Sequence, residues 1–394
     1  MTMTYLDHAS ATPLRKEVVR AMEPYYDEFF ANPSTVYDLG TGVREKIEEA
    51  RAQVAWLIGA TGERLAFTSS GAEANNMAVK GAALANRKKG NRVVVSGVEH
   101  HSVLNAARFL ERLDFEVAFL PVDDYGWVNP EKLSQILDDN TVLVSIMHAN
   151  NEIGTVQPIA ELAGICREKG ILFHTDCVAS VGQIPLDVEA LGVDLLTISA
   201  QPLQGPKGMG ALYVRKNVRL MPLIHGGIQE KGMRAGTENV PGIVGFGVAA
   251  ELAGQELQEN RNKLELLRDG LINGVRDRIP KVTFTGHHEH RLPGHASFCF
   301  QAVEGESLVF LLSQSGIYAN TGSACASKAL KLSPVLGALG IASDVAQGSL
   351  VFTMNRTNSQ EDIDRVLEGL PPAVERLRMM SPLWKEEKEG AAGS

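Results

Sequence analysis

The sequence has 394 residues, of which 44% are hydrophobic and 22% charged, and its formal net charge is −9. At roughly 100–200 residues per domain, this length predicts two or three packed units. No apolar run approaches the roughly 18 residues of a membrane span, and no block of Lys or Arg forms the basic surface typical of DNA- or RNA-binding proteins. Residues 1–13 lack the basic start and apolar core of a secretory signal, so we expect a cytoplasmic protein.

Helical periodicity alternates with short β-rich runs from residue 46 to residue 214. This alternation predicts a mostly parallel, seven-stranded sheet with helices on both faces, an α/β fold. In such sheets, ligands gather at the carboxyl ends of the strands. The seven expected strands are 65–68, 92–96, 116–120, 142–148, 171–175, 195–199 and 210–214.

A smaller α+β unit is expected in the C-terminal third of the chain. Apolar residues near helical spacing over 241–279 predict a long helix or a helix pair that joins the two units. The elements expected beyond it are strands at 281–284, 296–301 and 317–319 and helices from 305 and over 360–378. The expected domains are a large one over 15–260, a small one formed by 1–14 and 261–384, and a flexible tail, 385–394.

Three polar sites follow predicted strands. The loop 68–73 opens a helix, where backbone N–H groups can hold a phosphate, although small residues at such turns are often there only for packing. Asp176 can pair with a protonated ring nitrogen of a cofactor or serve as a helix N-cap. His100 can face the same sheet edge or be a structural histidine.

Four cysteines are spread along the chain without a CxxC pair, which excludes a compact four-cysteine zinc site. Cys325 ends a run of small residues that starts at Thr321, a composition that favours an exposed nucleophile or sulfur carrier over a buried thiol. The tract His287-His288-Glu289-His290 has the composition of a metal site. It lacks ligand spacing on a helix face, so a loop without metal is the favoured interpretation.

Several motifs occur in an order that is specific to one family. They are Tyr5-Leu6-Asp7-His8-Ala9-Ser10-Ala11-Thr12-Pro13, Asn32-Pro33-Ser34, His148-Ala149-Asn150-Asn151-Glu152-Ile153-Gly154, Gly205-Pro206-Lys207-Gly208, Gly226-Gly227-Ile228-Gln229-Glu230, Arg234-Ala235-Gly236-Thr237-Glu238-Asn239 and Gly322-Ser323-Ala324-Cys325. Over residues 3–383 the chain resembles the cysteine desulfurases of the NifS/IscS family. These enzymes have the class V aminotransferase fold, similar to fold type I, and use pyridoxal phosphate to move sulfur from cysteine to an active-site cysteine.

The resemblance implies a role for each matching residue. His100 matches the histidine that stacks on the cofactor ring, Asp176 the partner of its ring nitrogen, and Asn151 an asparagine at the cofactor and substrate. Arg356 matches the arginine that binds the substrate carboxylate, and Cys325 the cysteine that becomes a persulfide. The implied phosphate contacts are Gly71, Ala72, Ser199 and, supplied across a homodimer interface, Thr237.

The chain departs from the family pattern at the cofactor site. Where the family has Ser-x-His-Lys, this chain has Ser199-Ala200-Gln201-Pro202, so the Schiff-base lysine is replaced by Pro202, which has no amine. Ala72 stands where the family has a threonine, and Ala179 where it has a glutamine. Lys207 matches a family lysine that is present beside the catalytic one, so a surface lysine is the favoured interpretation.

Three functions remain open from the sequence. The first is a partner in sulfur mobilisation and iron–sulfur cluster assembly, without standard desulfurase activity, in which Cys325 carries persulfide or ligates a cluster shared with a scaffold protein of the IscU type or another sulfur acceptor. The second is an active desulfurase that holds pyridoxal phosphate noncovalently or through another lysine. The third is a non-catalytic pseudoenzyme that serves as a dimer partner.

Overall fold

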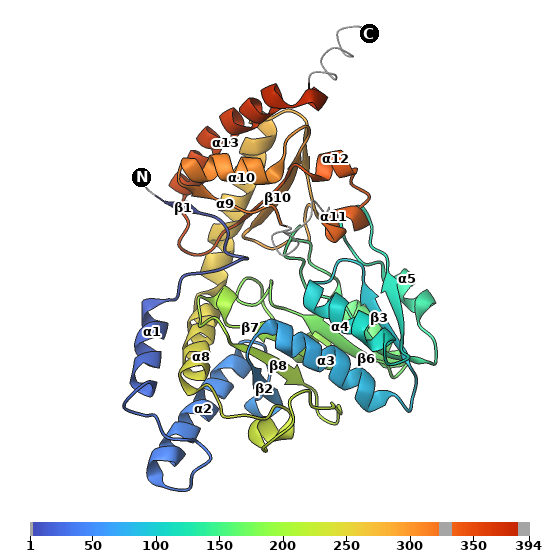
Figure 1. Ribbon diagram of the computed structural model, residues 1–394, viewed down its shortest axis with the longest axis vertical. Helices are drawn as coiled ribbons and strands as arrows, with labels where there is room; N and C mark the ends of the chain where they lie inside the picture. The colour runs from blue at the N-terminus through green and yellow to red at the C-terminus, as the bar shows by residue number, and fades with distance from the viewer. Residues whose placement is uncertain (1–2, 323–332, 385–394) are drawn as a thin grey trace.

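The structure is a computed structural model that describes residues 3–322 and 333–384. A large sheet lies in the lower half of Figure 1 and a smaller one in the upper half. Cys325 and the tail 385–394 lie outside the described residues. Within the described ranges, no helix has both the length and the apolar content needed to span a membrane.

The large sheet contains, in the described part of the chain, the seven strands that the sequence predicts. β8 runs antiparallel to both of its neighbours, while the other strands share one direction. The predicted strand 142–148 is wrong at its end, because the chain leaves the ladder after Ser145. In spatial order the strands are β2 (Leu65–Thr68), β8 (Gly210–Val214), β7 (Leu195–Ser199), β6 (Leu172–Asp176), β5 (Thr141–Ser145), β3 (Arg92–Ser96) and β4 (Glu116–Leu120).

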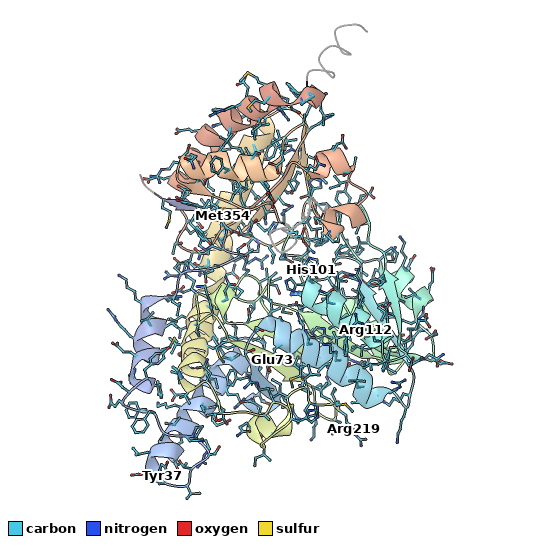
Figure 2. All side chains as sticks on the ribbon, in the orientation of Figure 1. Tyr37, Glu73, His101, Arg112, Arg219 and Met354 are labelled. Atoms are coloured by element: carbon cyan, nitrogen blue, oxygen red, sulfur yellow. The ribbon has the colours of Figure 1, made fainter. Side chains whose placement is uncertain are left out.

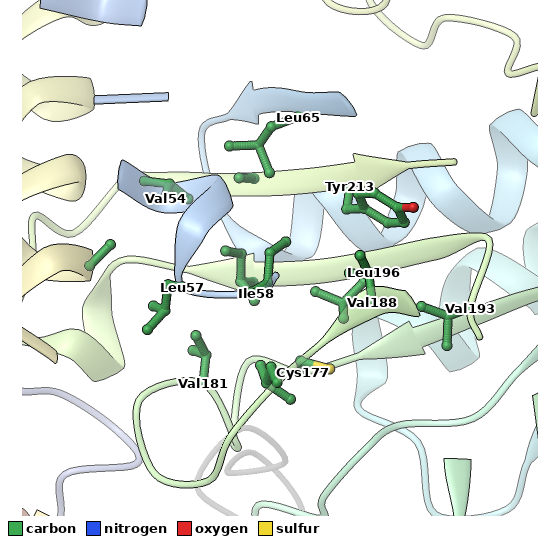
Figure 3. Close-up of a cluster of buried hydrophobic side chains, with 14 of the residues drawn as sticks. Val54, Leu57, Ile58, Leu65, Cys177, Val181, Val188, Val193, Leu196 and Tyr213 are labelled. Carbon is green, nitrogen blue, oxygen red and sulfur yellow. The ribbon is translucent and has the colours of Figure 1, made fainter. Parts of the chain in front are cut away.

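Helices cover both faces of this sheet, so its central strands are apolar on both sides. Val93 and Val95 pack against α3 and α4, whereas Val94 between them packs into the core under α2, α6 and α8. Figure 3 shows part of this second core, where Ile58 lies between Leu57 and Leu196 of β7 and the buried Cys177 belongs to the same cluster. The alternation follows from the two-residue period of a strand.

The large unit contains α-helices and short 3-10 turns. The α-helices are α1 (Lys16–Met22), α2 (Asp38–Trp56), α3 (Gly71–Asn86), α4 (His101–Glu111), α5 (Pro130–Ile136), α6 (Ile159–Glu168), α7 (Val188–Leu191) and α8 (Val240–Gln255). The 3-10 turns are η1 (Glu23–Tyr25), η2 (Gly62–Arg64), η3 (Gln201–Leu203) and η4 (Gln229–Gly232).

The smaller unit is built on an antiparallel sheet in the order β12-β10-β9. The predicted helix pair is confirmed as α8 and α9, which meet at Glu256, and α9 packs its Leu264 and Leu271 on the small-unit core. β12 was missed by the sequence prediction. The elements are β1 (Thr4–Tyr5), α9 (Leu257–Arg278), β9 (Val282–Phe284), β10 (His295–Phe300), α10 (Gly305–Gln314), β11 (Ile317–Tyr318), α11 (Pro334–Ala338), α12 (Ser343–Ala346), β12 (Ser349–Thr353) and α13 (Gln360–Met380).

Candidate functional site

A cavity of about 540 Å³ lies at the carboxyl edge of the large sheet, where the small unit closes over it. In Figure 2, Met354 after β12 lies in the cavity wall on the side of the small unit, and His101, next to the lining residue His100, begins α4 on the side of the large unit. This volume is in the usual range for small-molecule sites. The predicted site residues that line it are Gly71, Ala72, His100, Asn151, Asp176, Ser199 and Arg356.

Two predicted residues do not appear in the cavity wall. Thr237 is exposed and does not line this cavity. Cys325 lies outside the described residues, although Gly322, three positions before it, lines the cavity. Asn151 is held at the wall through its backbone, because its carbonyl oxygen lies 3.0 Å from Nε2 of His295.

Asp176 is a buried carboxylate at the last position of β6. One carboxylate oxygen accepts a hydrogen bond from Nδ2 of Asn75 at 2.6 Å and the other from the backbone N–H of Val178 at 2.9 Å. Burial raises the pKa of Asp176, while these hydrogen bonds and the charge of His100 oppose that shift. A cation bound beside Asp176 would favour its ionised form.

The same amide links Asp176 to His100. Nδ2 of Asn75 also donates to Oγ of Ser102 at 2.9 Å, and this oxygen lies 2.7 Å from Nδ1 of His100. His100 is at the same time the N-cap of α4, since its Nδ1 accepts from the N–H of Ser102. His100 is therefore both a helix cap and a cavity-wall residue, because capping fixes its ring at the cavity wall.

Glu99 is a second buried carboxyl group near Asp176. Its Oε1 accepts from Oγ of Ser96 at 2.6 Å and from the N–H of Met147 at 2.7 Å, while its Oε2 has no partner in the described residues. Burial raises the pKa of Glu99 from 4.5 to about 8, assisted by the charge of Asp176. Glu99 is therefore protonated at neutral pH.

Replacing Glu99 with glutamine is expected to flatten the pH dependence of stability. The folded carboxyl group holds its proton more tightly than the unfolded one, so its stabilising contribution is complete below pH 4.5 and is lost as pH rises through 8. The free energy of unfolding, measured by urea titration across this window, should fall more steeply for the native chain than for Glu99→Gln. Parallel pH profiles would contradict this assignment.

The first turn of α3 forms the end of the cavity suited to a phosphate. The first N–H groups of a helix have no intrahelical partner and attract anions. Ser70 caps the helix by accepting from the N–H of Glu73 at 3.1 Å. Gly71 is required here, because a Cβ atom at this position would lie 2.7 Å from Cγ2 of Val178. Ala72 offers this end a backbone N–H but no hydroxyl.

Pro202 lies in η3, directly after β7, and lines the cavity. Its loop is fixed to the N-terminal segment, since Oγ1 of Thr12 donates to the carbonyl of Gln201 and the N–H of Arg15 donates to that of Gln204 at 3.1 Å. No lysine lines the cavity among the residues that the structure describes. Lys207 is exposed, and its Nζ donates to the carbonyl of Thr12 at 3.0 Å.

A charged cluster that the sequence did not reveal lies at the opposite end of the cavity. Nε of Arg356 donates to Oε1 of Gln204 at 2.9 Å and lies 3.9 Å from Oε2 of Glu256. Arg15, which is buried, binds both oxygens of Glu256 at 2.9 and 2.7 Å. Hydrogen bonds from Arg15 lower the pKa of Glu256. Arg356 is thus positioned by Gln204 and Glu256, which lie outside the family motifs found in the sequence.

Comparison with known proteins identifies the family. The model described as "Aminotransferase class-V" matches residues 4–366. The chain belongs to the aminotransferase class V family. It is 50% identical over 383 residues to a protein of Methanosarcina thermophila named cysteine desulfurase IscS, with 97% of this chain and 95% of that protein covered. It is also 50% identical to cysteine desulfurase IscS 1 of Archaeoglobus fulgidus, covering 97% of this chain and all of that one.

Solved structures agree with this membership in the class V family. A structure titled NifS-like protein has a TM-score of 0.89 and 35% identity, covering 95% of this chain and 100% of its own. The NifS-like protein from Rickettsia africae gives 0.86 and 30%, again covering 95% and 100%. The expected resemblance to cysteine desulfurases and the expected fold are therefore confirmed.

The class V family implies pyridoxal phosphate. The residues present suit its ring nitrogen and its phosphate, but they do not offer a covalent attachment. The buried Asp176 suits a protonated ring nitrogen, and the first turn of α3 with Ser199 suits the phosphate. Oδ1 of Asn75, which also lines the cavity, is buried without a partner in the described residues. When bound, the cofactor supplies an electron sink. Pro202 offers no covalent attachment, so these residues fit a cofactor held noncovalently.

The three described cysteines of this class V chain are buried thiols. Burial raises the pKa of Cys166 and of Cys299 to about 12, and that of Cys177 still higher. Because the thiolate is the nucleophile and the metal ligand, these three thiols are unsuited to either role.

The histidine tract 287–290 forms no metal centre with its described surroundings. No group of three or more His, Cys, Asp or Glu side chains with metal-binding geometry occurs in residues 3–322 and 333–384. Nδ1 of His287 instead accepts from the N–H groups of Glu289 at 3.1 Å and His290 at 3.0 Å. The tract is a turn closed by its own histidine.

Proposed function

We propose that this chain serves sulfur mobilisation and iron–sulfur cluster assembly through Cys325, as persulfide carrier or cluster ligand, without standard pyridoxal-phosphate-dependent desulfurase activity. The observation that carries the proposal is Pro202 at the cavity wall, with no lysine among the described lining residues. The lysine of such enzymes captures the cofactor and transfers protons, so its replacement removes both functions together.

The assignment of sulfur chemistry to Cys325 is supported by elimination. Cys166, Cys177 and Cys299 are fully buried, and their raised pKa values keep them protonated near neutral pH. Cys325 is the fourth cysteine of the sequence, and it follows Gly322 at the cavity. Thiolates are the usual ligands of iron–sulfur clusters, so the partner in this proposal is a scaffold protein of the IscU type or another sulfur acceptor.

The proposed assembly is a homodimer. Thr237 is exposed and outside its own cavity, as required of a residue that completes the site of a second copy. Large apolar side chains of the large unit are also exposed, with Val36 95% and Ile228 90% accessible. Burial of such side chains in an interface stabilises a dimer.

A second candidate function is that of a working enzyme with noncovalently held pyridoxal phosphate. The linked array of Asp176, Asn75 and His100 favours it, because each side chain is still held for a ring in the cavity. This candidate predicts release of alanine from L-cysteine, which the first one does not.

One experiment with two readouts separates these candidates. The purified chain, given L-cysteine, excess pyridoxal phosphate and a reductant, should release alanine at the level of a cofactor-only blank. With sulfide and both ferrous and ferric iron supplied, so that the cluster forms without a further oxidant, it should load a scaffold protein with a cluster faster than sulfide and iron do alone. Cys325→Ser should abolish that gain, whereas Cys166→Ala should retain it. Alanine well above the blank would establish the second candidate, and the same gain with Cys325→Ser would exclude a role for this thiol and leave a pseudoenzyme partner.

A further inference from the structure

We propose that the turn formed by the histidine tract 287–290 is a pH-sensitive contact between the two units. With His287 neutral, the closed turn holds residues 153–156 of the large unit against the small unit. When His287 takes up a proton from solvent, the turn opens and this contact weakens. The turn lies outside the cavity wall, and the inference does not depend on the proposed function.

The turn makes hydrogen bonds to the large unit at both of its ends. At one end, the N–H of His287 donates to Oγ1 of Thr155 at 2.9 Å. At the other end, the carbonyl of His290 accepts from the N–H of Val156 at 2.8 Å. Opening the turn moves both groups away from their partners, so this contact between the units depends on the turn being closed.

A buried arginine joins the same two segments but does not respond to pH in the acid range. Arg291 donates through Nη1 to the carbonyl of His287 at 3.0 Å and through Nη2 to that of Ile153 at 3.2 Å. A Cβ atom on Gly286 would meet the carbonyl oxygen of Ile153, so the segments are in close contact. Burial lowers the pKa of Arg291 only to about 9, so its charge is unchanged between pH 5.5 and pH 7.5.

The closed turn requires the neutral form of His287. Its Nδ1 accepts from the N–H groups of Glu289 at 3.1 Å and His290 at 3.0 Å, so the proton of the neutral ring is on Nε2. In the imidazolium form both ring nitrogens are donors. A protonated Nδ1 would then face two N–H donors, and the two hydrogen bonds that close the turn would be lost.

The surroundings of His287 favour its neutral form in the closed turn. Burial lowers its pKa from the usual 6.5, and the charges of His290 and His288 lower it further, whereas Asp123 and Glu289 act in the opposite direction. Opening exposes the ring to solvent, where its pKa returns to about 6.5. The contribution of His287 to the closed turn is therefore complete above pH 6.5 and is lost as pH falls below that value.

Glu152, one position before the held segment, titrates in the opposite sense. Burial raises its pKa from 4.5 to about 7, so its contribution to stability is complete below pH 4.5 and is lost as pH rises through 7. Its Oε2 accepts from Oγ of Ser333 at 2.5 Å, a contact that does not involve the turn. Weakening of the contact in acid therefore cannot come from Glu152.

The test is amide hydrogen exchange of the full chain, followed by mass spectrometry at pH 7.5 and pH 5.5. Rates are expressed as protection factors, which removes the intrinsic pH dependence of exchange. Protection of residues 153–156 and 287–290 should fall together by about three- to tenfold at pH 5.5, since one pH unit below 6.5 permits a change of about tenfold at most. Unchanged protection would overturn the inference.

Two variants assign this response to His287. In His287→Asn, the side-chain oxygen takes the place of Nδ1, accepts the same two N–H groups and does not titrate, so protection should be equal at both pH values. His288→Asn is the matched control and should keep the native response, because His288 is an exposed histidine of the same turn whose ring makes no hydrogen bond within the described ranges. Native chain and variants are compared at each pH, so effects of acid on the rest of the protein cancel.

The remaining outcomes are equally decisive. The same loss of protection in His287→Asn as in the native chain would exclude His287 as the responding group. A loss confined to 287–290, with 153–156 unchanged, would exclude a contact between the units that depends on the turn. A second measurement needs no closed turn in the variant: the ring-proton resonance of His287, assigned by its absence in His287→Asn, should titrate below pH 6.5 in the native chain. Titration at or above 6.5 would overturn the inference.

Discussion

Replacing Glu230 with glutamine is expected to lower the free energy of unfolding by about 3–5 kcal/mol, because the change removes the buried counter-charge of Arg51 and leaves only the exposed Glu48, 3.2 Å from its Nε. Oε1 and Oε2 of Glu230 accept from Arg51 at 3.0 and 2.5 Å, and Oε2 also accepts from the N–H of Phe67 at 2.9 Å. The two side chains are 6% and 3% exposed. This pair joins α2 and β2 to η4, the turn that precedes Thr237.

The matched control for this prediction lies on the same helix. Lys46 and Glu49 form an ion pair on α2 whose side chains are 53% and 56% exposed. Exposed pairs contribute about 0–1 kcal/mol, so Glu49→Gln should change stability by no more than that. Both variants are compared by urea unfolding at one protein concentration. A loss below about 1 kcal/mol for Glu230→Gln would mean that the buried pair does not hold η4 in place.

The sheet was predictable from sequence because its strands are short apolar runs with polar residues at their ends. Five of the seven expected ranges agree with the structure at both ends, and the other two are displaced at their limits. β12 was missed, although it is entirely buried, because only a short segment separates it from α12. An isolated apolar run of this length is ambiguous without its partner, and β12 is fixed by pairing with β10.

The part of the cavity around Asp176 and His100 was predictable from the sequence. The part around Arg356 was predictable only in part. Asp176 ends β6 and His100 comes after β3, and because these strands run in the same direction, the topology brings both residues to one edge. Arg15 and Glu256 are 241 positions apart and belong to no motif. Their pairing depends on where the α8–α9 junction meets the N-terminal segment, which local sequence patterns do not encode. Asn75 was missed because its importance comes only from the buried Asp176 that it contacts.

Pro202→Lys alone is expected to fall short of full cysteine desulfurase activity. Position 202 lines the cavity, so a lysine there has access to it, and the change restores the missing amine. The side chains of Gln201, Ala179 and Ala72 still differ from the family pattern. If three hydrogen bonds remain absent, each contributing about 0.5–1.5 kcal/mol, the deficit corresponds to a factor of about ten to a thousand.

The comparison that decides this prediction is between the single variant and one that also carries Gln201→His, Ala179→Gln and Ala72→Thr. Alanine release from L-cysteine is measured for both against a cofactor-only blank, and retention of the cofactor through dialysis separates capture from turnover. Lys207→Gln in the Pro202→Lys background is the control, because Lys207 is exposed and outside the cavity. Equal activity of the single and the fourfold variant would show that Pro202 alone limits the site. Much higher alanine release by the fourfold variant would mean that the four positions act as one functional unit. A lysine amine can capture the cofactor by itself, whereas turnover also needs the contacts that orient the ring.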